Sequence, residues 1–401
     1  KMPETHFMGG IDRVSASLVP THKNNRKEIM NAVFSKLLIP YVDLTPQNNL
    51  VKNELIEAVS NVINSGQYVL GPEVIKFEKL FAEYVGTKYA VGVGNGTDAL
   101  FLALKAVNVG KGDEVITAPN SFLASASAIA LAGATPVFVD VREDFNLDPE
   151  LLKRSITKNT RAIIPIHLTG RPADMHTILK IAKNYQLYVI EDAAQAVGAK
   201  YHGQRVGSFG TAGCFSLHPL KNLSACGDAG IITTNKESIY RFLINARNHG
   251  LSNVNQCKHW SINSRLDALH AATLSVKLKY LDAWTNARRS IAGYYQKHLP
   301  TDIQVPIEQS HEYCVYQTFV VQADQRDDLQ KFLTKRGVNT KIHYPVPIHL
   351  QEAAAYLGYR QGDFPVAERH AQRILSLPVY PDLKKEQLEY VVNVLYEYFE
   401  G

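Results

Sequence analysis

Short apolar segments alternate with helical patterns through the middle of this 401-residue chain, and this alternation limits the fold more than any other feature. Helical spacing of apolar residues, as in Met175–Tyr185, separates the apolar segments from one another. The segments themselves are Glu114–Ala118, Pro136–Asp140, Arg161–Ile166 and Leu187–Glu191. Strands that are apolar on both sides and joined by helices form parallel sheets that are covered on both faces. The sequence therefore predicts an α/β fold with a mostly parallel sheet between helices.

The pattern changes after residue 265. Leu266–Tyr295 keeps helical spacing without turn signals, which predicts one or two long helices. Cys314–Gln322 is typical of a strand and Asp324–Arg336 of a helix. We therefore expect a large domain over residues 37–270 and a smaller C-terminal α+β domain over residues 271–401.

No signal peptide or membrane span is predicted. Residues 1–36 lack an apolar stretch and are interpreted as an N-terminal extension. The uncharged stretch Ala118–Val139 is long enough to cross a bilayer, but Pro119 and Pro136 interrupt it. A buried helix over Ser121–Leu131 followed by a buried strand explains this stretch better, so we expect no membrane contact.

Charge and cysteine content argue against two further classes of protein. The chain has 43 Lys and Arg against 38 Asp and Glu without a basic block, which excludes an electrostatically dominated nucleic-acid binder but suits an anionic small ligand. Its four cysteines are scattered, with no C-x-x-C motif and no Cys/His cluster, so we expect neither a disulfide scaffold nor a metal site. These features favour an enzyme of a reducing compartment, the cytoplasm.

Three motifs carry candidate chemistry, and the first is the glycine-rich stretch Val91–Leu100. It contains G-x-G-x-G rather than the G-x-G-x-x-G of dinucleotide-binding proteins, so a nicotinamide dehydrogenase is disfavoured. A glycine turn that leads into a helix near Thr97 presents free backbone N–H groups to an anion, usually one phosphate. The alternative is a strand-to-helix turn that needs glycines only for its backbone angles.

The second motif is an apolar strand that ends in two acids, the last being Asp192. A carboxylate buried at this point needs a cationic partner, and a protonated pyridine nitrogen is one that fits. The alternative is an aspartate that caps the following helix.

The third motif is Lys221, in a segment of small residues between His218-Pro219 and Asn222. A partly desolvated lysine has a lowered pKa and can attack a carbonyl to form a Schiff base. The alternative is a surface lysine in a loop. Together, a phosphate cradle, a carboxylate for a pyridinium and a Schiff-base lysine are the parts that a pyridoxal phosphate enzyme supplies.

From about Ile39 to its end, the chain resembles the sugar aminotransferases of the DegT/DnrJ/EryC1/StrS family, which belong to the aspartate aminotransferase superfamily, fold type I. The motifs that carry this resemblance are Gly71-Pro-Glu-Val, Gly96-Thr-Asp-Ala-Leu, Glu191-Asp-Ala-Ala-Gln195, Phe215-Ser-Leu-His-Pro-Leu-Lys-Asn-Leu223, Asn263-Ser-Arg-Leu-Asp267 and His343-Tyr-Pro-Val-Pro. The resemblance implies a fold type I transferase with pyridoxal 5'-phosphate as cofactor.

The resemblance also implies roles for single residues around the ring. Lys221 would hold the internal aldimine and move the proton, and Asp192 would keep the pyridine nitrogen protonated. Gln195 would hydrogen-bond the ring hydroxyl, and Phe122 would stack on the ring face unless it is an ordinary core phenylalanine.

For the phosphate, the resemblance implies the turn of Gly96, Thr97 and Asp98 together with the hydroxyl of Ser216. Asn263 of the other subunit would complete this site, so the family's active sites lie at the interface of a homodimer.

His343 and Tyr344 lie in a loop punctuated by prolines, where they would meet substrate or form a structural turn.

The implied reaction is a transamination from glutamate to a keto sugar in amino-sugar or polysaccharide biosynthesis. Relatives that act at sugar C3 have Gly-Asp-Gly-Gly after the lysine, so Gly227-Asp-Ala-Gly230 and Gln195 favour a 3-keto-deoxyhexose linked to dTDP or UDP. A 4-keto nucleotide sugar and a Kdo-type 8-oxo sugar remain alternatives.

Two other functions within this family remain open. A sugar dehydratase that uses the same cofactor would have histidine in place of Lys221. A catalytically idle regulatory homologue would tolerate the loss of Asp192 or Lys221, and both residues are present.

Overall fold

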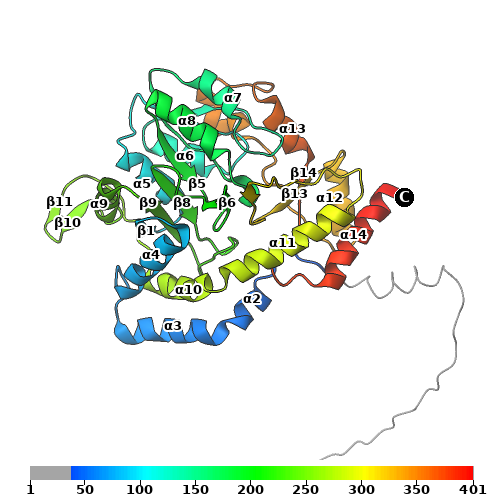
Figure 1. Ribbon diagram of the computed structural model, residues 1–401, viewed down its shortest axis with the longest axis horizontal. Helices are drawn as coiled ribbons and strands as arrows, with labels where there is room; N and C mark the ends of the chain where they lie inside the picture. The colour runs from blue at the N-terminus through cyan, green and yellow to red at the C-terminus, as the bar shows by residue number, and fades with distance from the viewer. Residues whose placement is uncertain (1–37, 401) are drawn as a thin grey trace, which may run out of the picture. The chain divides into compact units, whose positions relative to one another are not determined.

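A seven-stranded sheet is the central element of residues 38–400, the part of the chain that this computed structural model describes (Figure 1). In sheet order the strands are β1 (Tyr89–Val93), β9 (Gly230–Thr234), β8 (Ala212–Ser216), β5 (Tyr188–Asp192), β4 (Thr160–Ile163), β2 (Glu114–Thr117) and β3 (Thr135–Phe138). Within this sheet β9 alone runs antiparallel to its neighbours. The prediction of an α/β fold with a mostly parallel sheet is confirmed.

Helices cover both faces of this sheet. On each face, the helices and the strands pack together in one apolar cluster. One cluster contains buried side chains of α5 (Gly96–Ala106), α6 (Ala124–Leu131), α8 (Met175–Tyr185) and α9 (Glu237–Ala246). The other contains side chains of α4 (Pro72–Val85) and α10 (Ala268–Leu278).

The central strands contribute to both clusters. Along β8, Cys214 belongs to the first cluster and Phe215 to the second, because successive strand residues point to opposite faces. Phe215 is fully buried and packs edge-on against Phe81 at 5.1 Å between ring centroids. Full burial of such a side chain stabilises a fold by about 1.5–3 kcal/mol, which explains why these strands are apolar throughout.

The predicted helices agree with the structure except at their ends. The helix Met175–Tyr185 forms as predicted, with the Asp174 side chain accepting the Thr177 N–H at 3.2 Å. Of the helix predicted over Ser121–Leu131, only Ala124–Leu131 is helical, because the hydroxyls of Ser121 and Ser125 both bond the Phe122 carbonyl.

The long pattern after residue 265 is divided into α10 and α11 (Leu281–His298), as the alternative of two helices allows. Beyond them, the predicted strand Cys314–Gln322 shortens to β13 (Phe319–Gln322), because Tyr316 adopts φ +44° and cannot continue an extended strand. The predicted helix Asp324–Arg336 is α12 (Arg326–Lys335).

β13 pairs antiparallel with β14 (Ile374–Leu377) in a small second sheet. In the C-terminal part, α13 (Pro365–Arg373) directly precedes β14, and α14 (Lys385–Glu400) follows it. The domain boundary at residue 270 stays a prediction, and the N-terminal extension predicted over residues 1–36 lies outside the described residues.

The remaining elements are short, apart from α3. They are α2 (Thr45–Leu50), α3 (Lys52–Ser65), α7 (Pro149–Leu152), β6 (Lys200–Tyr201), β7 (Gln204–Arg205), β10 (Leu251–Asn253), β11 (Gln256–Cys257) and β12 (Glu312–Tyr313), with 3-10 turns at Lys153–Ser155, Leu168–Gly170, Ile348–Leu350 and Glu352–Leu357. Among residues 38–400 no helix has the length and apolar character needed to cross a membrane.

Candidate active site

The carboxyl ends of β1, β5 and β8 lie at one edge of the sheet, because these three strands run in the same direction. The residues singled out from the sequence follow those ends. β5 ends at Asp192, β8 ends at Ser216 and leads to Lys221, and the turn after β1 leads into α5. Ligands of parallel sheets bind at this edge, so the topology brings the three motifs to one place.

The turn after β1 is packed tightly against the end of β8. A Cβ atom on Gly96 would lie 2.8 Å from the Ser216 Cβ, and one on Gly230 would lie 2.3 Å from the Asn95 carbonyl oxygen. Both positions therefore require glycine. The Asn95 side chain accepts the Asp98 N–H at 2.9 Å, and the Ala99 N–H bonds the Asn95 carbonyl.

These bonds leave two donors of the first helical turn uncommitted. Among the described residues, the N–H groups of Gly96 and Thr97 have no hydrogen-bond acceptor. They begin an eleven-residue helix whose dipole favours an anion at this end. The turn therefore has the donors that a phosphate requires, with the hydroxyl of Ser216 beside it.

Asp192 and Lys221 lie close enough to affect each other's ionisation. Burial raises the pKa of the Asp192 carboxyl, while the Ala194 N–H, Lys221 and His167 oppose that rise. Burial lowers the pKa of the Lys221 amine, and the Asp192 carboxylate opposes that fall. Lys221 is therefore not the solvated surface lysine that the sequence left open. The Asp192 side chain accepts the Ala194 N–H at 3.1 Å, so it also makes the local cap that was the alternative for this residue.

Gln195 connects this centre to the C-terminal part of the chain. Its side-chain oxygen accepts the Thr169 N–H at 2.6 Å, and its amide donates to the Tyr344 hydroxyl at 3.2 Å. The Tyr344 ring lies 5.7 Å from the Phe122 ring, measured between centroids. Phe122 is 56% exposed, which excludes the alternative of an ordinary core phenylalanine.

His343 and Tyr344 face the same centre. Burial, together with the charges of Lys221 and Lys341, lowers the pKa of His343 to about 4. Burial and the Asp192 carboxylate raise the pKa of Tyr344 to about 12. His343 is held through its Nδ1 atom, 2.9 Å from the Ser376 hydroxyl. Both side chains are therefore neutral at pH 7.

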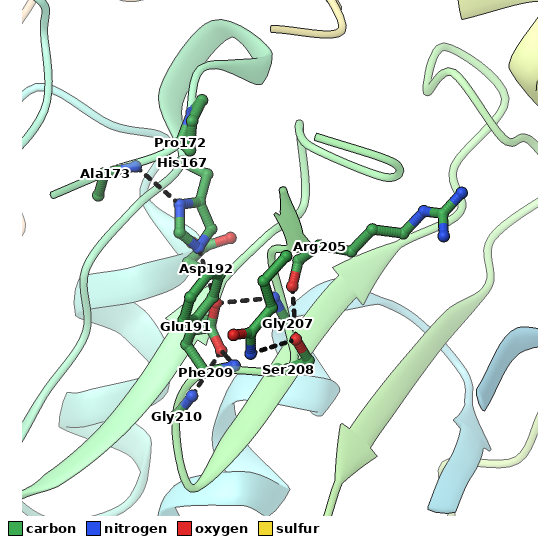
Figure 2. Close-up of polar contacts among 12 residues, drawn as sticks. His167, Pro172, Ala173, Glu191, Asp192, Arg205, Gly207, Ser208, Phe209 and Gly210 are labelled. Carbon is green, nitrogen blue, oxygen red and sulfur yellow. Dashed lines mark hydrogen bonds and ion pairs between the residues drawn. The ribbon is translucent and has the colours of Figure 1, made fainter. Parts of the chain in front are cut away.

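A second buried acid, Glu191, stabilises the end of β5, and the sequence analysis gave it no role. Figure 2 shows its carboxylate surrounded by donors, the backbone N–H groups of Gly207, Phe209 and Gly210 at 2.7–2.8 Å and the His167 Nε2 atom at 3.1 Å. His167 Nδ1 accepts the Ala173 N–H at 3.0 Å, so its proton lies on Nε2 and is donated to Glu191. The one sequence signal was an acid directly before Asp192, which strand alternation places on the opposite face.

Asn263 directly precedes Ser264, whose hydroxyl bonds Asp98 of the glycine turn. It is exposed, and its backbone forms a bridge with Asn248 beside the β10–β11 hairpin. Figure 1 shows this hairpin projecting beyond α9, away from the central sheet. Within residues 38–400 no cluster of His, Cys, Asp and Glu could hold a metal ion.

Residues 49–396 match the DegT/DnrJ/EryC1/StrS aminotransferase family. The chain belongs to this family. The pleiotropic regulatory protein of Geobacillus stearothermophilus is 44% identical over 366 residues, which cover 90% of this chain and 98% of that protein. The dTDP-3-amino-3,6-dideoxy-alpha-D-galactopyranose transaminase of Aneurinibacillus thermoaerophilus is 43% identical over 363 residues, covering 90% of this chain and 99% of that protein.

Solved structures agree with the fold. The crystal structure of S. venezuelae DesV in complex with a ketimine intermediate matches with a TM-score of 0.89 at 39% identity, covering 91% of this chain and 99% of that chain. Proteins of this family are aminotransferases that depend on pyridoxal phosphate, so the predicted fold, family, enzyme class and cofactor are confirmed.

The residues present fit this cofactor. The glycine turn and Ser216 offer donors to a phosphate, and Gly96 is packed so closely that a Cβ atom would collide with Ser216. The buried Asp192 carboxyl, which accepts one hydrogen bond from the described part of the chain, offers an acceptor to a cationic ring nitrogen. Lys221 offers an amine with a lowered pKa.

Proposed function

We propose that this aminotransferase moves an amino group from glutamate to the keto group of a nucleotide-linked 3-keto-deoxyhexose, with Lys221 and Asp192 as its catalytic residues. One observation carries the assignment of these residues. A buried acid and a half-buried lysine each alter the other's pKa at the edge of the sheet where a glycine turn begins α5.

Lys221 acts as nucleophile and then as acid and base. Because burial lowers its pKa, a larger share of its side chain is free amine at neutral pH than for an exposed lysine. A free amine would hold the cofactor through its carbonyl carbon, with water as the leaving group. Once the substrate's amino group displaced Nζ, the freed amine would take the proton from the substrate carbon and deliver it to the cofactor.

Asp192 supplies the opposite charge beneath the ring. Bound pyridoxal phosphate supplies an electron sink for the bonding pair at the substrate carbon. Asp192 keeps the ring nitrogen protonated, because a buried carboxylate is stabilised by an adjacent cation. Glu191 holds the strand end that positions Asp192, and Gln195, which is hydrogen-bonded to Tyr344, would help to orient the ring.

The phosphate is proposed to bind at Gly96, Thr97 and Asp98 of the turn, together with Ser216. The exposed ring of Phe122 stacks on the cofactor, and the neutral side chains of His343 and Tyr344 meet the substrate. A neutral histidine suits a site that must admit both a glutamate and a bulky nucleotide sugar.

The sugar is inferred from two features. The transaminase of A. thermoaerophilus is named for a dTDP-linked sugar with its amino group at C3. The Gly227-Asp-Ala-Gly230 sequence after the lysine favours the same position. We therefore place the keto group at C3 and the carrier as dTDP or UDP.

A homodimer with shared active sites is part of this proposal. Three large apolar side chains of α3 and α4 are more than half exposed: Ile56, Ile63 and Ile75. Covering such a face in a second copy removes it from water. Asn263 is exposed, as a residue that serves the partner's phosphate site must be. The four free cysteines support a cytoplasmic enzyme.

A purely regulatory role competes with this function, because the G. stearothermophilus relative is named a pleiotropic regulatory protein. The presence of Asp192, Lys221 and the glycine turn at one edge of the sheet supports catalysis instead, because a regulatory homologue would tolerate their loss. Lys221 likewise disfavours a sugar dehydratase.

The test combines spectroscopy with a substrate panel. The purified protein with pyridoxal phosphate should absorb in the near-visible, and Lys221→Ala should abolish both this band and turnover. Lys277→Met is the matched control, because Lys277 on α10 is also a buried lysine whose pKa is lowered by burial, and its Nζ lies 3.4 Å from the Ser224 hydroxyl. This control should keep the band.

Substrate choice is read by mass spectrometry with glutamate as donor. We expect an aminated product from a 3-keto nucleotide sugar and little from the matched 4-keto sugar. An aminated 4-keto or 8-oxo sugar would correct the substrate assignment. A band that survives in Lys221→Ala would reject the lysine assignment, and no product from any keto sugar would favour the regulatory role.

A further inference from the structure

The carboxylate of Asp98 takes part in a hydrogen-bond network with Ser264 and Asn95. The Ser264 hydroxyl donates to Asp98 Oδ2 at 2.7 Å, and the Asn95 amide donates to the same oxygen at 3.0 Å. The Gly94 N–H donates to the Ser264 oxygen at 2.9 Å. A serine from a distant part of the chain therefore bonds both ends of the turn.

Ser264 is buried, whereas the residue before it, Asn263, is exposed. The segment that carries both is also held by hydrogen bonds to residues 247 and 248. The Ser264 N–H donates to the Arg247 carbonyl at 2.9 Å, and the Arg265 guanidinium donates to the Asn248 side chain at 3.0 Å. A buried residue that is bonded on both sides leaves its neighbour little freedom.

The same network reaches the strand before the turn. Arg247 is buried and forms an ion pair with Glu78, and its guanidinium also donates to the Gly92 carbonyl at 3.0 Å. Glu78 accepts the Gly92 N–H at 2.7 Å. The end of β1, the phosphate turn and the segment that follows the β10–β11 hairpin are thus one hydrogen-bonded unit.

We infer that Ser264, together with Asp98, is a positioning residue that couples the phosphate turn of one subunit to Asn263, and through Asn263 to the cofactor site of the partner subunit. This inference rests on the proposed function, which assigns Asn263 to the partner's site. Asp98 then acts through its carboxylate on Ser264, while its backbone belongs to the turn. A carboxylate that faced the phosphate directly would repel it.

Coupling through Ser264 predicts that one substitution weakens cofactor binding at both sites of a dimer. In its own subunit, Ser264→Ala removes an acceptor from Gly94 and a donor from Asp98. In the partner subunit, the only change is a looser Asn263. One hydrogen bond contributes about 1 kcal/mol, so we expect about fivefold weaker cofactor binding in the same subunit and a smaller loss, about threefold, in the partner.

Hybrid dimers separate the two effects. Two differently tagged full-length chains are co-expressed, and Lys221→Ala in one of them ensures that only the other can attach the cofactor. The dimer is titrated with pyridoxal phosphate and reduced with borohydride, and the mass of each chain gives the occupancy of the intact Lys221. Ser264→Ala is placed first on the chain with the intact lysine and then on the Lys221→Ala chain.

Ser261→Ala is the matched control. Ser261 lies in the same segment, but its hydroxyl donates to the Ala246 carbonyl at 2.7 Å rather than to the turn. The inference requires weaker binding in both arrangements for Ser264→Ala and in neither for Ser261→Ala. Asp98→Asn is a second variant, and it should repeat the pattern because it weakens the same bond to Ser264.

Asn263→Ala on the Lys221→Ala chain distinguishes the two ways to fail. If Asn263→Ala weakens the partner's site but Ser264→Ala on that chain does not, the coupling is wrong and the shared site stands. If Asn263→Ala has no effect on the partner, the shared site is rejected and the coupling with it. An equal loss from Ser261→Ala would show general loosening of the segment and would also overturn the inference.

Discussion

The two adjacent acids at the end of β5 both have carboxylate side chains, yet they differ in how many hydrogen bonds the protein donates to them. Glu191 is fully buried and accepts hydrogen bonds from four donors, three of them backbone N–H groups of the 207–210 loop. Asp192 is 7% exposed and, within residues 38–400, accepts one hydrogen bond, from Ala194. The first carboxylate is satisfied by the protein, whereas the second is buried with much of its hydrogen-bonding capacity left to a ligand.

This difference separates anchoring from chemistry at one strand end. The loop bound by Glu191 fixes the end of β5 from one face. On the other face Asp192, Lys221, His343 and Tyr344 all have shifted pKa values, with burial as the largest cause for each. Groups that share desolvation and mutual charge in this way are typical of functional sites.

The strongest test of this comparison exchanges the charge of Asp192 for an amide. Asp192→Asn should lower turnover by about 10²- to 10³-fold, because the pyridine nitrogen loses the anion that keeps it protonated. The same change should raise the melting temperature of the cofactor-free protein at pH 7. The pKa of Asp192 is raised in the fold, so the charged form costs stability at a pH above that raised value, and asparagine removes this cost.

Steady-state kinetics and thermal melts check both parts. A lowered melting temperature without cofactor would show that Asp192 is an anchor like Glu191. Unchanged turnover would remove it from the proposed mechanism.

The converse change is Glu191→Gln, which should act mainly on stability. The amide keeps one acceptor oxygen but turns its NH₂ group toward N–H donors, so buried groups lose their partners. Loss of such charge-assisted bonds costs about 2–3 kcal/mol of the free energy of unfolding. Urea unfolding measures this loss, and kcat per cofactor-loaded subunit should change far less than in Asp192→Asn. A kcat loss equal to that of Asp192→Asn would erase the distinction between the two acids.

His343, on the same face as Asp192, should make the stability of the protein depend on pH. Its pKa is lowered to about 4 in the fold, against about 6.5 for an unfolded histidine. Between these values the unfolded chain binds a proton that the folded chain does not, so this stabilising contribution is present above pH 6.5 and is lost as the pH falls toward 4. His343→Gln should therefore reduce the loss of stability over this range by about 2 kcal/mol, allowing for partial exposure. Unfolding curves of both proteins at pH 7, 5.5 and 4 measure the difference. If the free energy of unfolding fell equally with pH in the original chain and in His343→Gln, the prediction would be contradicted.

The sequence was sufficient for the parts of this site that depend on chain order. Apolar strands predicted the sheet, and parallel strands bring Asp192, Ser216 and the Gly96 turn to one edge. The contacts of Glu191 could not be predicted from the sequence, because their donors belong to a loop fifteen or more residues away that has no pattern of its own. The Ser264–Asp98 bond joins residues 166 positions apart, which no local periodicity can predict.

The smallest expected effect belongs to Ser208, which lies inside the loop that Glu191 anchors (Figure 2). Its hydroxyl donates to the Arg205 carbonyl at 2.6 Å and accepts from the Gln204 side chain at 3.0 Å, where both partners can exchange these bonds for water. Ser208→Ala should therefore cost about 0.5–1 kcal/mol in urea unfolding and leave cofactor affinity unchanged. Because the neighbouring N–H groups of Gly207, Phe209 and Gly210 still reach Glu191, the loop keeps its anchor. A loss as large as that of Glu191→Gln would mean that the turn, and not the buried carboxylate, holds the end of β5 in place.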